Sequence, residues 1–304
     1  MSHSNLNVSL TQFQNNIYSQ HGEDGIIEEV LSRIGHASVL DGWCVEFGAW
    51  DGIFLSNTYN LIKNKNYKAV LIEGDRKRHK ELCNNIPSND VIKVFQFVTF
   101  DGESTLDCIL QNTPIPNSFD LLSIDIDGCD YFIFESLKTY QPKIICIEYN
   151  PTIPNDIDFI QPKDFSIKQG SSAKSITHLA VTKGYSLVAT THCNLIFVRN
   201  DVKEHVIGSK DIALELLRDD TNCKSYIFIG YDGTILTNKT FIFMPWHGIE
   251  LNPGSLQQLP KYLRKFSADY SFLQKLAFGG FLLLKFPRQI SRILKRYLDS
   301  RNRI

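Results

Sequence analysis

Carboxylates cluster where two apolar segments of the sequence end. Asp125, Asp127 and Asp130 fall within six positions after one apolar segment, and Glu148 and Asn150 end the next. Carboxylates placed in this way can take the proton of a substrate hydroxyl, bind the ammonium group of a ligand, or hold a divalent cation through oxygen. The simpler alternative for Asp127 and Asp130 is that they cap the helix that follows.

These side chains give two overlapping sets of candidates. For proton transfer we predict Asp125 or Asp127 as the general base, and His192, in a later turn, as a further candidate whose simpler interpretation is an ordinary loop histidine. For a metal we predict Asp127, Glu148 and Asn150, because carboxylate and amide oxygens suit Mg²⁺ or a similar ion.

A glycine turn follows the first apolar segment of the chain. That segment carries Glu46 near its end, and Gly48 and Gly52 follow, with Asp51 between them. Glycines let the backbone approach a ligand closely and aim the N-terminus of the next helix at it, so we expect a nucleotide-like ligand here. Trp50 stands where a dinucleotide fingerprint has its middle glycine, which disfavours NAD and FAD. Alternatively, the two glycines only shape a tight turn.

Glu73 ends the second apolar segment, about twenty residues after this turn. A carboxylate at that position commonly accepts hydrogen bonds from ribose hydroxyls, so we predict that Glu73 binds the cofactor. Thr99, at the end of the third segment, can reach an adenine, with a plain strand-end threonine as the alternative.

The elements that must position these residues recur at intervals of about one βα unit, as expected for a doubly wound, mostly parallel α/β sheet. We predict a helix before the first strand, over 22–34, and another over 170–184. Two later β-rich segments, 185–190 and 195–198, are close enough in sequence to form an antiparallel hairpin at the far edge. The five predicted parallel strands are 43–47, 69–73, 91–98, 120–125 and 143–148.

After about residue 200 the α/β alternation stops. We predict a small β appendage around an Asp232-Gly233 turn, closed by the segment 244–248. In that segment His247 and Trp246 either line an acceptor pocket or form a packed turn. The predicted domains are 1–200 for ligand binding, 201–265 for the appendage and 266–304 for a basic helical tail, and the predicted appendage strands are 225–229, 234–236 and 240–243.

Positive charge is concentrated in that tail. The formal net charge is −1, yet residues 271–304 hold eight Lys or Arg against the single Asp299. Apolar positions fall on one helical face with basic residues on its flanks, which suits an anionic membrane surface; docking on the chain itself or on a partner subunit is the alternative. The remainder is acidic, which disfavours nucleic acid as a partner. The apolar positions of this face are Ile290, Ile293, Leu294, Tyr297 and Leu298.

Cysteine usage and the ends of the chain indicate a cytoplasmic protein. The seven cysteines are scattered singly, with no C-x-x-C pair, as in a reducing compartment. The N-terminal segment lacks the basic start and apolar centre of a secretory signal. The longest apolar run, 276–284, is far shorter than the roughly 20 residues that span a bilayer.

Five motifs together resemble the FkbM-type S-adenosylmethionine-dependent methyltransferase family, over about residues 15–200. The resemblance implies a seven-stranded class I methyltransferase sheet and methyl transfer to oxygen, often on a sugar or polyketide. It also implies cofactor binding by Glu46, Gly48 and Glu73, with Asp125 beside the methyl group. The motifs are YSQHGEDG at 18–25, VEFGAWDG at 45–52, SNT at 56–58, IEGD at 72–75 and LSIDIDG at 122–128, and they add Gln20, Glu23, Ser56 and Asn57 as candidate cofactor residues.

We therefore expect an S-adenosylmethionine-dependent O-methyltransferase that acts on a hydroxyl of a sugar, glycan or glycolipid precursor, held near the membrane by residues 271–304. Two alternatives stay open: an NAD-linked dehydrogenase or epimerase, which would also use Glu73, and a binding module that keeps the cofactor pocket without acceptor chemistry. The sequence does not specify the oligomeric state.

Overall fold

The computed structural model describes residues 9–290 and 292. Within this part of the chain there are two compact units, one ending at Cys223 and the other beginning at Lys224. The first unit therefore includes residues 201–223, which the sequence analysis grouped with the β appendage. We describe each unit by itself.

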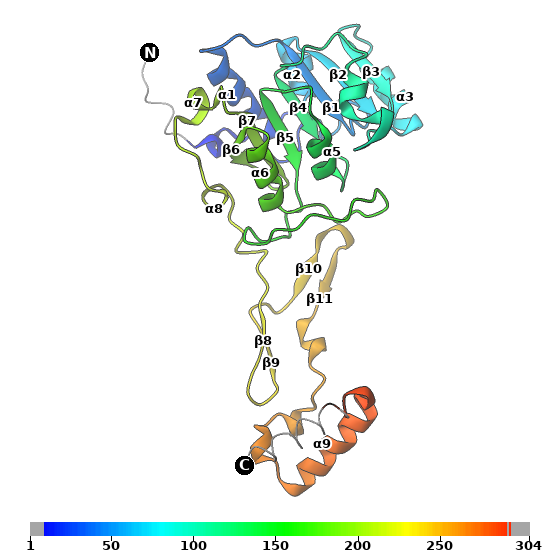
Figure 1. Ribbon diagram of the computed structural model, residues 1–304, viewed down its shortest axis with the longest axis vertical. Helices are drawn as coiled ribbons and strands as arrows, with labels where there is room; N and C mark the ends of the chain where they lie inside the picture. Colours follow the sequence, from blue (N-terminus) through cyan, green and yellow to red (C-terminus); the bar gives the residue numbers. More distant parts are fainter. Residues whose placement is uncertain (1–8, 291, 293–304) are drawn as a thin grey trace. The chain divides into compact units, whose positions relative to one another are not determined.

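The first unit is built on a seven-stranded sheet with the order β3-β2-β1-β4-β5-β7-β6 (Figure 1). The first five strands are parallel, and β7 runs antiparallel to both β5 and β6. This confirms the predicted doubly wound sheet with a hairpin at its far edge. The strands are β1 (Trp43–Phe47), β2 (Lys68–Glu73), β3 (Val91–Phe95), β4 (Leu121–Ile124), β5 (Ile144–Glu148), β6 (Tyr185–Thr190) and β7 (Asn194–Arg199).

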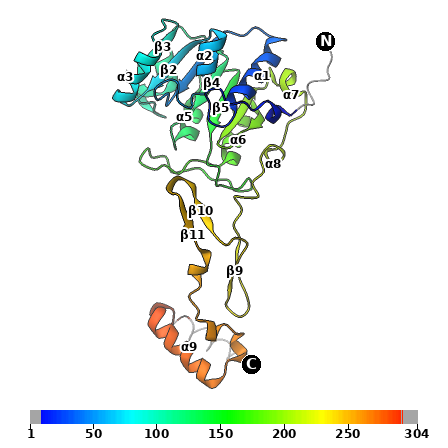
Figure 2. The same cartoon turned by 180° about the vertical axis from the view of Figure 1, so that it is seen from behind.

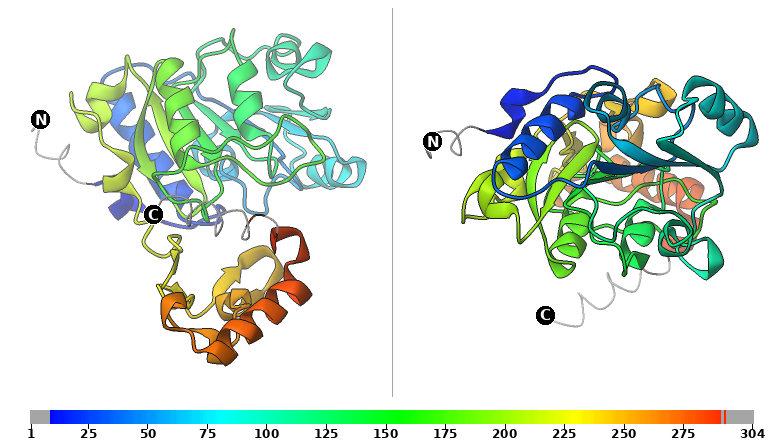
Figure 3. Two further views of the ribbon diagram at one scale, coloured as in Figure 1. Left: turned by 60° about the horizontal axis from the view of Figure 1, so that its bottom comes forward. Right: turned by 90° about the horizontal axis from the view of Figure 1, so that it is seen from above.

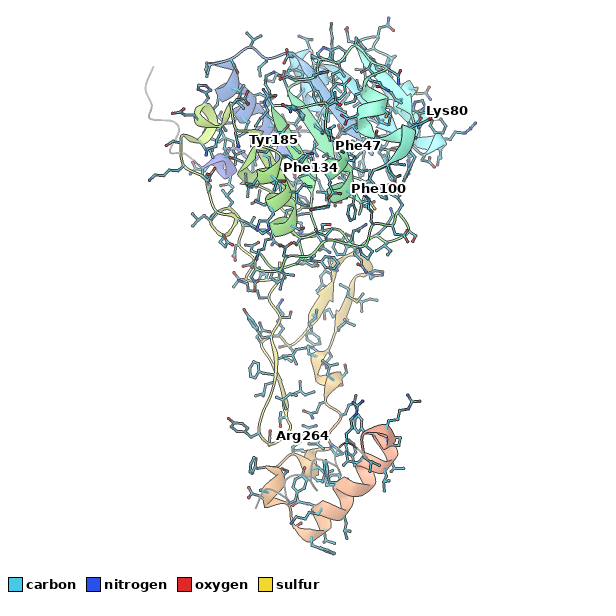
Figure 4. The ribbon with its side chains drawn as sticks, viewed as in Figure 1. Phe47, Lys80, Phe100, Phe134, Tyr185 and Arg264 are labelled. Atoms are coloured by element: carbon cyan, nitrogen blue, oxygen red, sulfur yellow. The ribbon has the colours of Figure 1, made fainter. Side chains whose placement is uncertain are left out.

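Helices cover both faces of the sheet (Figures 1 and 2). Successive strand residues point to opposite faces, so that Val45 packs in the cluster with α4, α5 and α6, while Cys44 packs in the cluster with α1, α2, α3 and α7. In the first cluster the rings of Phe134 and Tyr185 meet edge to face at 6.1 Å (Figure 4). The helices are α1 (Glu23–Gly35), α2 (Tyr59–Lys65), α3 (Arg76–Asn85), α4 (Leu106–Leu110), α5 (Asp130–Ser136), α6 (Ala173–Thr182), α7 (Lys203–Ile207) and α8 (Leu214–Leu217).

Element boundaries follow from local chemistry. Helix α6 begins where the Ser172 side chain accepts from the backbone of Ser175, which is the predicted serine cap. Strand β3 ends at Phe95, earlier than the predicted residue 98, because its neighbour β2 ends at the facing residue Glu73 and residues 97 and 98 have no ladder partner.

The second unit contains two separate two-stranded hairpins and a helix. The first hairpin turns at Asp232 and Gly233, as predicted. The segment 244–248 does not close the appendage, as the sequence suggested, but turns into a fourth strand that was not predicted. Helix α9 follows, orange to red in Figure 3. The elements are β8 (Ile227–Ile229), β9 (Ile235–Thr237), β10 (Ile242–Met244), β11 (Ile249–Leu251) and α9 (Phe272–Lys285).

The apolar face predicted for the tail lies mostly outside the described residues. Of its positions only Ile290 is described, and Arg292 is described among the basic residues of its flanks.

Candidate functional site

The strand order reverses between β1 and β4, which are neighbours in the sheet. In doubly wound sheets, ligands bind outside the carboxyl ends of the strands at this reversal. The loops that follow the two strands, 48–58 and 125–129, carry most of the residues singled out in the sequence. The fold therefore brings the glycine turn and the carboxylate cluster to one place.

The two glycines of the turn are explained by neighbours within the protein. Gly48 has a φ of 71°, and a Cβ there would lie 2.0 Å from the backbone oxygen of Asp125. Gly52 has a φ of 82°, and a Cβ there would lie 2.4 Å from Leu82. Helix α2 begins only at Tyr59, so the glycine turn does not lead directly into a helix. The glycines permit close packing of the loop against the β4 loop and helix α3.

Glu73 holds the glycine loop in place. Its Oε2 accepts from the backbone N–H of Trp50 at 2.8 Å, and its Oε1 accepts from that of Asp75 at 2.7 Å. Trp50 has a φ of 52°, a conformation that costs a non-glycine residue about 1 kcal/mol, and the Arg78 guanidinium stacks on its ring at 3.9 Å. Each carboxylate oxygen of Glu73 can accept a further hydrogen bond, so ribose binding is compatible with this structural role.

Glu46 is buried, and its carboxylate accepts hydrogen bonds from three consecutive residues of the loop after β1. Its Oε1 accepts from Asn57 N at 2.9 Å, and its Oε2 accepts from Ser56 Oγ at 2.5 Å and Thr58 Oγ1 at 2.7 Å. Asn57 Nδ2 in turn donates to Ser123 Oγ on β4 at 3.0 Å. Burial raises the pKa of Glu46, and these hydrogen bonds oppose the rise. The SNT motif thus fastens the loop to β1 and β4.

Asp51 and Thr99 make local contacts. Asp51 Oδ1 accepts from the backbone of Ile53 and Phe54, which shapes the loop. Thr99 Oγ1 donates to the backbone oxygen of Asp101 at 2.7 Å. Each side chain therefore has a local structural role in its own loop.

Asp130 holds the loop after β4 together. Its two carboxylate oxygens accept from the backbone of Ile126 at 2.9 Å and of Gly128 at 2.8 Å. Burial raises its pKa, although these hydrogen bonds lower it. Asp127, in the same loop, is exposed, has a φ of 57° and lies 3.7 Å from Lys168. The loop therefore turns Asp130 inward and leaves Asp127 available to a ligand.

Asp125 and Glu148, from adjacent strands, form a hydrogen-bonded carboxyl pair. Burial raises the pKa of Asp125, and the negative charges of Asp130, Asp127 and Glu46 raise it further. Burial and the charge of Asp125 raise the pKa of Glu148. Two carboxyl groups in contact cannot both ionise easily, so each raises the pKa of the other.

Asp127 joins this pair to form a potential cation site. One oxygen from each of Asp125, Asp127 and Glu148 lies within 4.8 Å of the others. Asn150, the third predicted metal ligand, is otherwise engaged: its Oδ1 accepts from the N and Oγ1 of Thr152. The structure therefore places Asp127 and Glu148 together with Asp125, and turns Asn150 into the following loop.

Glu23 ties the N-terminal loop to the β6–β7 turn. Its Oε1 accepts from Thr191 Oγ1 at 2.5 Å and from Asn194 Nδ2 at 3.1 Å, and its Oε2 accepts from His21 N at 2.7 Å. Glu23 is fully buried. Its role in the structure is to position the segment that carries the first motif.

A histidine pair lies at the end of this network. The rings of His21 and His192 are 4.9 Å apart, and burial, with a contribution from His192, lowers the pKa of His21. Asn194 faces Glu148 across the β5–β7 ladder, which brings the histidines to the β5 side of the carboxyl pair. Gln20 is exposed beside them. The sequence analysis did not select His21, although the motif at 18–25 contains it.

Three cavities of about 670, 460 and 470 Å³ lie in the first unit. The largest is lined by residues of α1 and α2, among them Glu28 and Lys65. The residues that line these three cavities include none of the candidate site residues, so the site is defined by its chemistry at the sheet edge.

Comparison with known proteins finds a family similarity over one part of the chain. Residues 101–178, which span β4, β5 and the carboxyl pair, match the model of the methyltransferase FkbM domain. No curated protein sequence matches. Similar solved structures include an S-adenosylmethionine-dependent methyltransferase from Aquifex aeolicus, with 13% identity, coverage of 62% of this chain and 94% of that one, and a TM-score of 0.35. Another is M. jannaschii TYW2 in complex with AdoMet, with 17% identity, coverage of 61% and 79%, and a TM-score of 0.33.

The family match confirms the resemblance found in the sequence, and the observed sheet has the seven strands that the resemblance implied. It favours methyl transfer over the dehydrogenase alternative. Residues 101–178 of the chain are similar to the methyltransferase FkbM domain.

Proposed function

We propose that this enzyme transfers the methyl group of S-adenosylmethionine to a hydroxyl oxygen of a sugar, glycan or glycolipid precursor. The observation that carries the proposal is the carboxyl pair of Asp125 and Glu148 beside the strand-order reversal. A carboxyl group with a raised pKa is suited to accept a proton near neutral pH. A hydroxyl acceptor must lose a proton when its oxygen is methylated, so it needs such a group.

The residues present fit a cationic cofactor. Asp125, Asp127 and Glu148 place mutually repelling negative charge at one sheet edge, and a ligand with a sulfonium and an ammonium group would relieve that repulsion. Glu73 would accept hydrogen bonds from the ribose, and the backbone of the Gly48 loop would line the same ligand. We propose that Glu46, Ser56, Asn57 and Glu23 contribute by positioning these loops, with Gln20, Asp51, Gly52 and Thr99 as further residues near the cofactor.

The bound cofactor supplies an electrophilic methyl group. Asp125 would accept the proton of the acceptor hydroxyl on a carboxylate oxygen as that hydroxyl oxygen takes up the methyl group, and the electron pair of the C–S bond would stay with the donor's sulfur. Glu148 holds Asp125 in position through their hydrogen bond. Asp127 and His192 are alternative proton acceptors in this proposal.

A divalent cation is a further proposal for the same site. Asp127 and Glu148 would bind it with Asp125, and it would orient the acceptor oxygen and lower the pKa of the hydroxyl. Measuring activity after exhaustive chelation tests this point, since full retention of turnover would rule out a metal requirement.

Calorimetry tests the cofactor proposal directly. S-adenosylmethionine and its demethylated product should bind, and NAD should not. Glu73→Ala should weaken binding by about tenfold or more, because a hydrogen bond to a charged group contributes about 1.5–3 kcal/mol. The matched control is Glu103→Gln, an exposed carboxylate in the first unit, which should leave affinity unchanged.

Turnover on a panel of hydroxyl-bearing acceptors then separates an enzyme from a binding module. Detection of methylated product by mass spectrometry supports the proposal, and Asp125→Asn should reduce kcat more than it raises KM. Tight binding of NAD, or unchanged donor affinity in Glu73→Ala, would contradict it. Donor binding without turnover on any acceptor would favour the binding module.

A further inference from the structure

Helix α9 in the second unit begins at a defined point. The Ser271 side chain accepts from Gln274 N, and the Gln274 side chain accepts from Ser271 N, which forms a capping box. Gln274 also donates to the backbone oxygen of Tyr262. The start of this 14-residue helix is thus fixed by its own sequence and by a contact within the unit.

One face of α9 packs within the second unit. The ring of Phe278 meets that of Tyr270 at 5.7 Å, and the ring of Phe281 meets that of Phe286 at 5.6 Å. Phe278 and Phe281 lie on one side of the helix because residues three apart are neighbours on its surface. These contacts account for one of its two apolar sides.

The opposite side of α9 presents large apolar side chains to solvent. At about 100° per residue they form a stripe covering roughly a third of the helix circumference. We call this stripe the outer face of α9. Its members and their exposed fractions are Phe272 at 74%, Leu273 at 75%, Leu276 at 60%, Leu283 at 64% and Leu284 at 84%.

An exposed apolar stripe of this size marks an interaction surface. No helix in residues 9–290 is long and apolar enough to cross a membrane. A helix of 14 residues is about 21 Å long, whereas the hydrocarbon core of a bilayer is about 30 Å thick. A short apolar face of this kind suits a position at an interface rather than across a bilayer.

The charges on α9 and just after it indicate the partner of the outer face. Lys275 and Lys285 lie on α9, Arg288 and Arg292 follow it, and the sequence has no Asp or Glu between Asp269 and Asp299. A second copy docked through the same face would bring these cations together, with no carboxylate from residues 270–298 to oppose them. An anionic lipid surface offers both an apolar layer for the stripe and negative charge for its basic neighbours.

We propose that the outer face of α9 docks on an anionic lipid surface, with its leucines and Phe272 entering the headgroup boundary and the lysines and arginines meeting lipid phosphates. This inference goes beyond the proposed methyl transfer and does not depend on it. It places the surface-binding element on α9 itself, ahead of the tail positions that the sequence analysis selected.

Co-sedimentation with vesicles tests the proposal on the full chain. The chain should pellet with vesicles of phosphatidylcholine and phosphatidylglycerol, much less with phosphatidylcholine alone, and less as salt is raised, because salt screens the charge contribution. Leu276→Glu combined with Leu283→Glu should lower the partition coefficient by about tenfold or more, because two apolar side chains no longer enter the lipid.

The matched control is Leu216→Glu, which changes an equally exposed leucine on α8 of the first unit. It should pellet like the unmodified chain, and S-adenosylmethionine affinity should be the same in all three proteins, which verifies that the first unit stays folded. Failure of the unmodified chain to pellet with the anionic vesicles overturns the proposal. Equal pelleting of the double variant also overturns it, as would a lipid-free dimer in sedimentation equilibrium that the double substitution dissociates.

Discussion

Replacing Glu148 by glutamine should make the protein more stable while making it a poorer enzyme. In the folded chain the pKa of the carboxyl pair lies above its ordinary value because of burial and mutual repulsion. One carboxyl therefore stays protonated in the folded state at a pH where both ionise in the unfolded state. The folded state loses stability as pH rises from about 4, the ordinary carboxyl pKa, toward the raised value. Glu148→Gln removes one member of the pair and keeps an amide beside Asp125.

The size of the effect follows from the pKa rise. Each unit of pKa corresponds to about 1.4 kcal/mol. Because Asp125 is partly exposed, we count only about one unit of the rise in pKa. The expected gain in stability is therefore about 1–3 kcal/mol near neutral pH. For a folded unit of this size, 1 kcal/mol shifts the melting temperature by roughly 2–4 °C. Glu148→Gln should therefore melt about 3 °C or more above the unmodified protein.

Calorimetric melting near neutral pH and near pH 3 measures this directly. The gain should be present at neutral pH and nearly absent at about pH 3, where both carboxyls are mostly protonated in either state. Glu103→Gln is the control for loss of one negative charge in the first unit. A melting temperature at or below that of the unmodified protein at neutral pH would refute the reasoning, and so would a gain that persists in acid.

Three further predictions concern the site and its support. Gly48→Ala should destabilise the first unit by about 2–4 kcal/mol in denaturant titration because its Cβ meets the Asp125 carbonyl; Gly42→Ala, with positive φ but no neighbour within 4 Å, should cost less. The affinity for S-adenosylmethionine, measured by calorimetry, should rise with pH as the pair of Asp125 and Glu148 loses its proton, and should be flatter in Asp125→Asn. Lys143→Met should lower stability by about 3 kcal/mol in thermal melting, because the fully buried Asp120 loses its counter-ion.

The sheet could be predicted because its strands carry strong local signals. Strands buried on both faces read as continuous apolar runs, and β5 is an example in which Ile144 to Ile147 are all buried. Strand β11 was missed because its three residues follow a Gly248 turn and alternate around the polar Glu250, which is too short a pattern to indicate a strand.

The site could be predicted only in part. Asp125 and Glu148 were expected to be close because adjacent strands end at the same sheet edge, whereas their shared proton depends on burial that the sequence does not reveal. Gly48 was assigned to ligand approach, yet its neighbour is a carbonyl 77 positions along the chain. Contacts of this kind arise from packing between loops and leave no periodic signal in the sequence.

The bonds of Glu23 to Thr191 and Asn194 join segments 168 and 171 positions apart. During synthesis, the first helix can form early, but the Glu23 carboxylate lacks its Thr191 and Asn194 partners until the β6–β7 hairpin has left the ribosome. The histidine side of the site is therefore assembled after the rest of the sheet. A nascent chain that has completed β1 to β5 would already hold the carboxyl pair. It would bring His21 into place beside His192 only when the last two strands have formed.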